Sequence, residues 1–327
     1  MMVLRKLLPS LAFVALAACA GVATVAPPPT LAPGWRMGEA SMRPVTLGLP
    51  GGARLAEGVS FAGGVEIVLD PASPLHSLSD LKLIGEGHFV SVTDAGDLVR
   101  GRMELDRAGR LTGVSGLRHY RLSLPNGAPI VEKADGDAEG LAFTHAGDLL
   151  VSFERDHRIW NYGRDETPAR RPVVAAMPDH AFPLNDGIEG LAASSRGWAA
   201  AGESGGLWDC DGDGCITLVA PPASPLADRE YRITGMDEDP WGDGWLVVQR
   251  SYAPPVDARA RVRRMNGRGD LGPVLIELKL PGTTDNFEGI AAERRGDGAR
   301  LYILSDDNGN PAQRTLLLAF DIQEPLP

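Results

Sequence analysis

Cysteine and aromatic residues are scarce in this chain of 327 residues, which holds 3 Cys and only 6% Phe, Trp and Tyr. Aliphatic residues are still plentiful enough to form a core. The 6 His are scattered without the spacing of zinc ligands. After the N-terminal region, no segment is long and apolar enough to cross a bilayer.

Basic residues are also fewer than acidic residues. The formal net charge is -11, and removal of Arg5 and Lys6 with an N-terminal signal would make it -11 - 2 = -13. Such a chain, without a basic stripe, should repel nucleic acid. The acid excess suits cation binding or simple solubility. The 40 Gly and 26 Pro predict many turns and few long helices.

The N-terminus has the pattern of an export signal. A cationic start at Arg5 and Lys6 precedes an apolar run over residues 7–18, which is too short to span a bilayer comfortably. The ending Leu16-Ala17-Ala18-Cys19 resembles the lipobox of bacterial lipoproteins, which implies removal of residues 1–18 and a lipid on Cys19. The alternative is an ordinary signal cleaved after small residues.

The residues that follow suggest where the protein is sent. Ala20, rather than Asp, stands after the cysteine, which in Gram-negative bacteria fits outer-membrane sorting. We therefore expect a lipid-anchored protein on the periplasmic side of the cell envelope. Residues 19–40, rich in Ala, Pro and Thr, are expected to be a flexible tether, and residues 41–327 the folded domain.

The other two cysteines lie in the segment Asp209-Cys210-Asp211-Gly212-Asp213-Gly214-Cys215. In an oxidising compartment, Cys210 and Cys215 should form a disulfide. The alternating aspartates also resemble the start of a calcium loop, but Ala220 stands where an EF-hand has its twelfth-position acid. The segment is therefore either a calcium loop or a solvated turn closed by a disulfide.

An internal repeat dominates the rest of the chain. In each copy, an apolar strand, a Gly-containing turn and a second apolar strand predict a hairpin. The copies begin at Ser79-Asp80-Leu81, Glu139-Gly140-Leu141, Glu189-Gly190-Leu191, Thr234-Gly235-Met236 and Glu288-Gly289-Ile290. The spacings of 60, 50, 45 and 54 residues fit four short strands per unit, the period of a β-propeller blade.

We therefore predict an all-β fold, a β-propeller with six blades, or with five as the alternative. Residues 43–69 contain further strand-like runs. They could supply the sixth blade, or close the ring with the C-terminal run at residues 316–321.

Acidic residues recur in register within the repeat. Glu139, Glu189 and Glu288 precede the repeated glycine, and the second strands end near Asp94, Glu154, Glu203 and Asp306. A hairpin places the start of its first strand beside the end of its second, so these acids should meet on one face near the central channel.

Two interpretations of the convergent acids stay open. Glu139, Glu189, Glu288 and Asp306 could hold a cation, and oxygen-only ligands favour Ca²⁺ or Mg²⁺. Alternatively, the acids could be turn residues whose carboxylates accept hydrogen bonds from backbone N–H groups. Arg155, His157 and Arg250 stand beside the acids and are candidate ligands for a phosphate or carboxylate.

Several segments together resemble the phytase-like β-propeller family, named for an esterase-like activity of phytase. The segments are Asp137-Ala138-Glu139-Gly140-Leu141-Ala142, Ser152-Phe153-Glu154-Arg155, Asn185-Asp186-Gly187-Ile188-Glu189-Gly190-Leu191 and Leu304-Ser305-Asp306-Asp307-Asn308. The resemblance covers roughly residues 60–322. It implies a propeller fold and phosphoester hydrolysis with clustered acids holding Ca²⁺. Ser79-Asp80-Leu81 departs from the family's more usual Ser-Gly-Leu.

Three functions follow as hypotheses. The first is an exported, metal-dependent phosphoester hydrolase acting on a small phosphorylated or ester substrate. The second is a non-catalytic envelope propeller that binds a ligand or a protein. The third is a serine esterase, because Gly202-Glu203-Ser204-Gly205-Gly206 matches Gly-x-Ser-x-Gly, although no helix pattern follows the serine. We expect a monomer that contacts the membrane only through its lipid.

Overall fold

The computed structural model describes residues 34–323 except 165 and 243, and these residues form 23 strands and no α-helix. The all-β prediction is confirmed. Among these residues there is accordingly no helix of the length and apolarity that crossing a bilayer requires. Cys19 and the expected signal, residues 1–18, lie outside the described part of the chain.

The described strands form four sheets, in which twenty of the strands make five antiparallel groups of four. A parallel bridge between Gly63 and Leu111 joins two of these groups in one ten-stranded sheet. The first group is β5 (Leu78–Leu83), β6 (His88–Thr93), β7 (Asp97–Leu105) and β8 (Leu111–Arg121). The second is β9 (Ala138–Phe143), β10 (Leu149–Phe153), β11 (Arg158–Asn161) and β12 (Val173–Val174). The third is β13 (Ile188–Ala193), β14 (Trp198–Gly202), β15 (Leu207–Asp211) and β16 (Gly214–Val219).

The fourth group is β17 (Arg232–Glu238), β18 (Gly244–Ala253), β19 (Asp257–Asn266) and β20 (Leu271–Lys279), with β3 (Ala53–Leu55) added at its edge. The fifth is β21 (Asn286–Arg295), β22 (Gly298–Asp306), β23 (Thr315–Gln323) and β4 (Val59–Val68). β1 (Arg36–Met37) pairs with β8, and β2 (Ser41–Pro44) pairs with β4.

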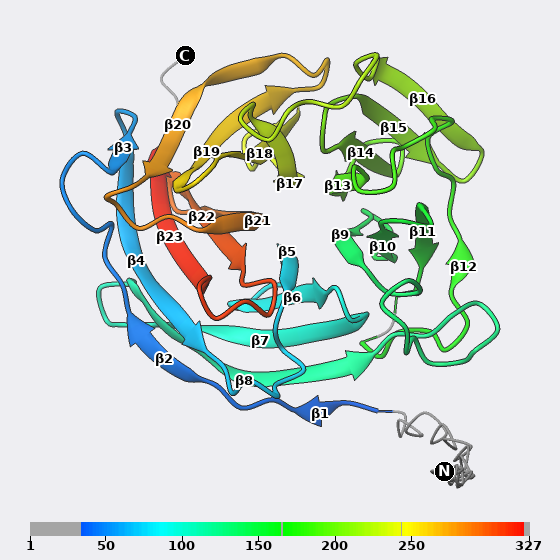
Figure 1. The fold of residues 1–327 in the computed structure, drawn as a ribbon, viewed down its shortest axis with the longest axis horizontal. Coiled ribbons are helices and arrows are strands. Elements are labelled where there is room, and N and C mark those ends of the chain that lie inside the picture. The colour runs from blue at the N-terminus through cyan, green and yellow to red at the C-terminus, as the bar shows by residue number, and fades with distance from the viewer. Residues whose placement is uncertain (1–33, 165, 243, 324–327) are drawn as a thin grey trace, which may run out of the picture. The chain divides into compact units, whose positions relative to one another are not determined.

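The five groups are arranged around a common centre, with β5, β9, β13, β17 and β21 innermost (Figure 1). Each innermost strand contacts the next, and β21 contacts β5, so the described strands form a propeller-like ring of five groups. Six blades are not confirmed. Residues 59–68 form the strand β4, which pairs with β23, and this is the ring closure that we considered as the alternative to a sixth blade.

The apolar core lies between neighbouring groups. Five clusters of buried side chains occur among the described residues, and each combines strands from two adjacent groups. Leu81 and Tyr302 belong to the cluster between the first and fifth groups, and Leu150 and Trp208 to the one between the second and third. Because these apolar faces are buried, each hairpin has a fixed orientation. The end of the hairpin that carries the repeated acids therefore lies at the ring opening.

Hydrogen bonds also join neighbouring groups near the centre. The Asp80 carboxylate accepts from the Leu141 N–H at 2.8 Å, which links β5 to β9. Ser152 Oγ donates to the Ile188 carbonyl oxygen at 2.8 Å, and Thr234 Oγ1 donates to that of Phe287 at 2.8 Å. These bonds satisfy backbone groups that the short inner strands would otherwise leave unpaired.

The folded domain begins earlier than residue 41. β1 pairs with β8, and the Trp35 ring lies 5.6 Å from that of Tyr120 between ring centres. The Gly38 N–H also donates to the Leu117 carbonyl oxygen at 2.8 Å. The end of the expected tether therefore belongs to the sheet, because an aromatic ring and backbone hydrogen bonds hold it there.

Candidate functional site

A β-bulge occurs at the same place in four of the five innermost strands, and β5 has an irregular pairing just after that place. The pairing of each inner hairpin shifts by one residue at Glu139, Glu189, Thr234 and Glu288, and the corresponding shift in the first group spans Asp80 and Leu81. A bulge leaves one residue out of the regular alternation and re-aims its side chain. The repeated Glu-Gly pattern therefore marks bulges at the ring opening.

The glycine after each bulge allows the next inner strand to approach. A Cβ atom on Gly235 would collide with the backbone of Glu288, and one on Gly289 would lie 2.8 Å from the backbone of Asp80. Any larger residue would push two groups of the ring apart. The glycine thus has a structural role, whereas the acid before it is free to serve another purpose.

The acids meet in one cavity of about 340 Å³ at the ring opening. All four acids predicted as metal ligands line it, and so do Asp94, Asp137, Glu154 and Glu203. The cationic side chains in its wall are Lys133, Arg155, Arg232 and Arg250. Eight carboxylates against four cations leave a formal charge of 4 - 8 = -4.

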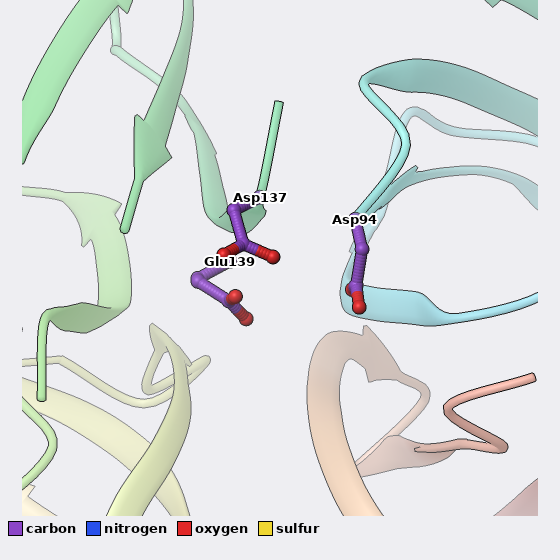
Figure 2. Close-up of side chains that lie close together, drawn as sticks. All are labelled: Asp94, Asp137 and Glu139. Carbon is purple, nitrogen blue, oxygen red and sulfur yellow. The ribbon is translucent and has the colours of Figure 1, made fainter. Parts of the chain in front are cut away.

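Three of these carboxylates are especially close. Asp94, at the end of the first inner hairpin, faces Asp137 and Glu139 at the start of the second (Figure 2). One oxygen from each lies within 4.8 Å of the other two, an arrangement that a metal ion could join. Lys133 Nζ lies 2.9 Å from Asp94 and 3.1 Å from Asp137 in this structure.

Burial and mutual repulsion disfavour ionisation of these acids. Burial, followed by the charges of nearby carboxylates, raises the pKa of Glu139 and of Glu189 well above the usual range. Burial raises the pKa of Glu154 to about 7, with Asp137 next in effect. The pKa of Glu288 also rises to about 7 because of burial, against the opposing effect of Arg250. A bound cation would favour the ionised forms.

The turn-acid interpretation fails for the glutamates. Within the described residues, the carboxylates of Glu139 and Glu189 have no hydrogen-bond or ion-pair partner, although Glu189 is only 6% exposed. Glu288 is bonded to side chains, including Arg250 at 3.1 Å and Asn286 at 2.7 Å. Asp306 alone of the four follows the turn pattern, since it accepts from the Asn308 N–H at 2.6 Å.

The predicted anion-binding residues are partly brought together. Arg155 and Arg250 line the cavity, Arg155 paired with Asp137 and Arg250 with Glu288 and Glu203. His157 does not line it. The His157 Nε2 atom lies 2.8 Å from the Pro183 carbonyl oxygen, and its ring packs against Phe182.

The cysteine segment forms the tight turn of a hairpin. Cys210 and Cys215 pair across β15 and β16 and form the predicted disulfide. The Asp211 carboxylate accepts from the N–H groups of Asp213, at 2.9 Å, and Gly214, at 3.2 Å, and also pairs with Arg196. These contacts fit the disulfide-closed turn rather than a calcium loop.

Ser204 lies in a turn after β14, and no helix follows it in the described chain. Its Oγ donates to the Asp186 carboxylate and accepts from the Leu226 N–H at 2.9 Å. The strand–turn–helix elbow that Gly-x-Ser-x-Gly requires is absent from this segment. The serine instead holds two connecting segments together.

Three residues of the cavity, Asp137, Lys133 and Arg232, were not predicted from the sequence. Asp137 stands two residues before Glu139, so its position next to the repeated Glu-Gly pattern was a usable signal. Lys133 comes from the connection between the first two groups, and no repeat pattern marks it. Arg232 begins β17 and pairs with Glu203 of the preceding group.

The family model described as phytase-like, esterase-like activity of phytase, matches residues 73–309. The match covers most of the chain, which therefore belongs to this family. The matched range contains every acid of the cavity. Among curated proteins, none matches the chain.

Solved structures with a similar fold share little sequence with the chain. The major Malassezia sympodialis allergen Mala s 1 is 14% identical, with a TM-score of 0.42 over 81% of this chain and 89% of the allergen. The PQQ-bound aldose sugar dehydrogenase from Streptomyces coelicolor is 15% identical, with a TM-score of 0.36 over 88% of this chain and 100% of the enzyme. A Bacteroides thetaiotaomicron protein of unknown function is 9% identical, with a TM-score of 0.42 over 86% and 76%.

Proposed function

We propose that this chain is a metal-dependent phosphoester hydrolase whose acidic cavity holds Ca²⁺ or a similar hard divalent cation. The observation that carries the proposal is the pair Glu139 and Glu189, two carboxylates that line a strongly acidic cavity without a partner in the described chain. Buried charges of this kind are costly unless they are paired or coordinate a metal.

The donor set suits such a cation. Asp94, Asp137 and Glu139 would be the central ligands, because one oxygen from each lies within 4.8 Å of the other two. Glu189, Glu288 and Asp306 line the same cavity and would complete the acidic donor set. All are carboxylates, and Ca²⁺ and Mg²⁺ prefer oxygen ligands. A bound divalent cation would polarise a phosphoryl oxygen and lower the pKa of a bound water molecule.

The chain's own side chains would bind the substrate and move the proton. The guanidinium groups of Arg155 and Arg250 line the same cavity and are suited to bidentate contacts with phosphate oxygens. Glu154 lines the same cavity and would accept a proton from the attacking water at its carboxylate, which a bound cation would keep ionised.

We also propose that the mature protein is exported and anchored by a lipid on Cys19, on the periplasmic side of the cell envelope. The motivation is the cationic start, apolar run and Leu16-Ala17-Ala18-Cys19 ending. The disulfide between Cys210 and Cys215 is consistent with an oxidising destination.

The activity is tested on the full-length protein with p-nitrophenyl phosphate and p-nitrophenyl acetate, each with Ca²⁺ and with a chelator. We expect calcium-dependent hydrolysis of the phosphate ester, lost in Glu189→Gln and retained in the exposed control Glu39→Gln and in Ser204→Ala. Tight calcium binding without turnover on any phosphoester would instead favour the non-catalytic binding protein. Hydrolysis of the acetate that is lost in Ser204→Ala would favour the serine esterase.

A further inference from the structure

A second cavity, larger than the acidic one, adjoins it. Its volume is about 710 Å³, within the range of small-molecule sites. Arg232, Arg250 and Asn308 line both cavities, so a ligand held by the arginines would extend from one into the other. We call this second cavity the side groove; it lies between the fourth and fifth groups of strands.

The charges of the side groove are nearly balanced. Its lining contains three arginines, Arg232, Arg250 and Arg314, and two aspartates, Asp228 and Asp285, for a formal sum of 3 - 2 = +1. Arg232 pairs with Asp228 at 2.8 Å, and Arg314 pairs with Asp285 at 3.3 Å. With a formal sum of only +1, the groove lining cannot neutralise a ligand with many phosphates. This charge distribution fits a single anionic group near Arg250.

The remaining wall combines apolar and amide surfaces. Tyr252, Val256 and Leu280 are 41%, 65% and 51% exposed, which leaves apolar surface open to a ligand. The Tyr252 hydroxyl donates to the Pro255 carbonyl oxygen at 3.0 Å and so fixes the ring. A fixed aromatic ring beside apolar side chains is suited to stacking against a ring of the ligand.

Amide side chains form the opposite rim. Asn308, Asn310 and Gln313 line the groove from the segment that follows β22. Asp307 orders this segment, because its carboxylate accepts from the Gly309 N–H at 2.9 Å and from Thr315 Oγ1 at 2.7 Å. Amide groups held in this way can donate to and accept from hydroxyl groups.

We infer that the side groove binds the organic part of a phosphate monoester, an uncharged ring that carries hydroxyl groups, while its single phosphate reaches Arg250 and the acidic cavity. This inference rests on the proposed phosphoester hydrolysis. It adds to that proposal the class of substrate, which is a ring with one phosphate rather than a ring with several.

The test compares myo-inositol 1-phosphate with myo-inositol hexakisphosphate and methyl phosphate, on the full-length protein with Ca²⁺. The first two share a ring and differ in charge, and the third lacks the ring. We expect the highest kcat/KM for inositol 1-phosphate. Tyr252→Ala should raise its KM about tenfold, because the carbon face of the ring loses the apolar surface against which it would pack, and leave kcat/KM for methyl phosphate unchanged. Val256→Ser should act in the same direction.

Val174→Ser is the matched control, because Val174 is 68% exposed on β12, outside the groove lining. It should change neither KM. A preference for the hexakisphosphate, or equal effects of Tyr252→Ala on inositol 1-phosphate and methyl phosphate, would overturn the inference.

The proposed hydrolase activity and the inferred binding in the side groove can be tested separately. If no phosphoester is hydrolysed, calorimetric binding of inositol 1-phosphate decides the question. Saturable binding that Tyr252→Ala weakens and Val174→Ser leaves intact would uphold the groove without catalysis. Absence of binding, or binding that Tyr252→Ala does not change, would refute it.

Discussion

Arg250 Nη1 lies 3.1 Å from Glu288 Oε1, and this ion pair joins the end region of an inner strand in the fourth group to the bulge of the fifth. Arg250 also lies 3.5 Å from Glu203 of the third group. One guanidinium therefore offsets part of the charge on one side of the cavity. Glu139 and Glu189 have no such partner among the described residues, so a cation bound in the cavity would act most strongly on them.

The first prediction concerns pH. Burial raises the pKa of Glu154 from 4.5 to about 7, so between these values the folded protein keeps a proton that the unfolded chain has lost. In the presence of a chelator, the contribution of Glu154 to the free energy of unfolding should therefore fall as pH rises from 4.5 to 7. Glu139 and Glu189, whose pKa values are also raised, should act in the same direction. Glu154→Gln should remove roughly 1 kcal/mol of this loss, because solvent screens a carboxylate that is only half-buried.

Denaturant unfolding at pH 5 and pH 8 measures the effect, with Glu39→Gln as the exposed control. Added Ca²⁺ should flatten the pH dependence of the wild-type protein, because a cation favours the ionised carboxylates. A free energy of unfolding that is greater at pH 8 than at pH 5 in chelator would contradict the account.

The second prediction concerns the close approach of inner strands. Gly235→Ala places a methyl group against the backbone of Glu288 and should destabilise the protein by about 3 kcal/mol or more. Gly267→Ala is the control, since nothing lies within 4 Å of a Cβ atom at that position. Thermal unfolding compares the two variants. Equal stability would show that the ring does not depend on this contact.

The third prediction concerns the disulfide. The native protein should show no free thiol from Cys210 or Cys215, and reduction should cost about 2 kcal/mol, as expected for closure of so short a loop. Thiol labelling before and after reduction, followed by unfolding in denaturant, measures both quantities. Rapid labelling of the unreduced native protein would rule out the bond.

The fourth prediction concerns Cys19. Mass spectrometry of the mature N-terminus from a bacterial host should find a lipid-modified cysteine as the first residue. Cys19→Ser should release the protein from the membrane fraction. A mature N-terminus beyond Cys19, without modification, would favour an ordinary cleaved signal.

The convergence of the acids could be predicted from the sequence because it follows from hairpin pairing. Glu189 at the start of one strand and Glu203 after the next had to lie at the same end of their hairpin, whatever the number of groups. The bulges could not be predicted in the same way. Whether Glu189 pairs regularly or bulges inward depends on the backbone of the neighbouring group.

The count of blades could not be predicted from the sequence for a related reason. The strand-like residues 59–68 are compatible with a separate blade or with an added strand, and periodicity does not distinguish the two. The choice depends on pairing with residues 315–322 at the far end of the chain. Lys133 was missed because it lies in a connection that varies between the copies.

Calcium-dependent thermal unfolding of Glu189→Gln tests the central claim most directly. In the wild-type protein, Ca²⁺ at 100 times its dissociation constant should add about 2.7 kcal/mol, a rise in Tm of about 5 °C, which a chelator reverses. The response should be lost in Glu189→Gln and retained in Glu39→Gln and in Asp211→Asn, which alters the cysteine hairpin. No calcium-dependent shift in the wild type, or a shift that Asp211→Asn alone abolishes, would contradict a cation site at the ring opening.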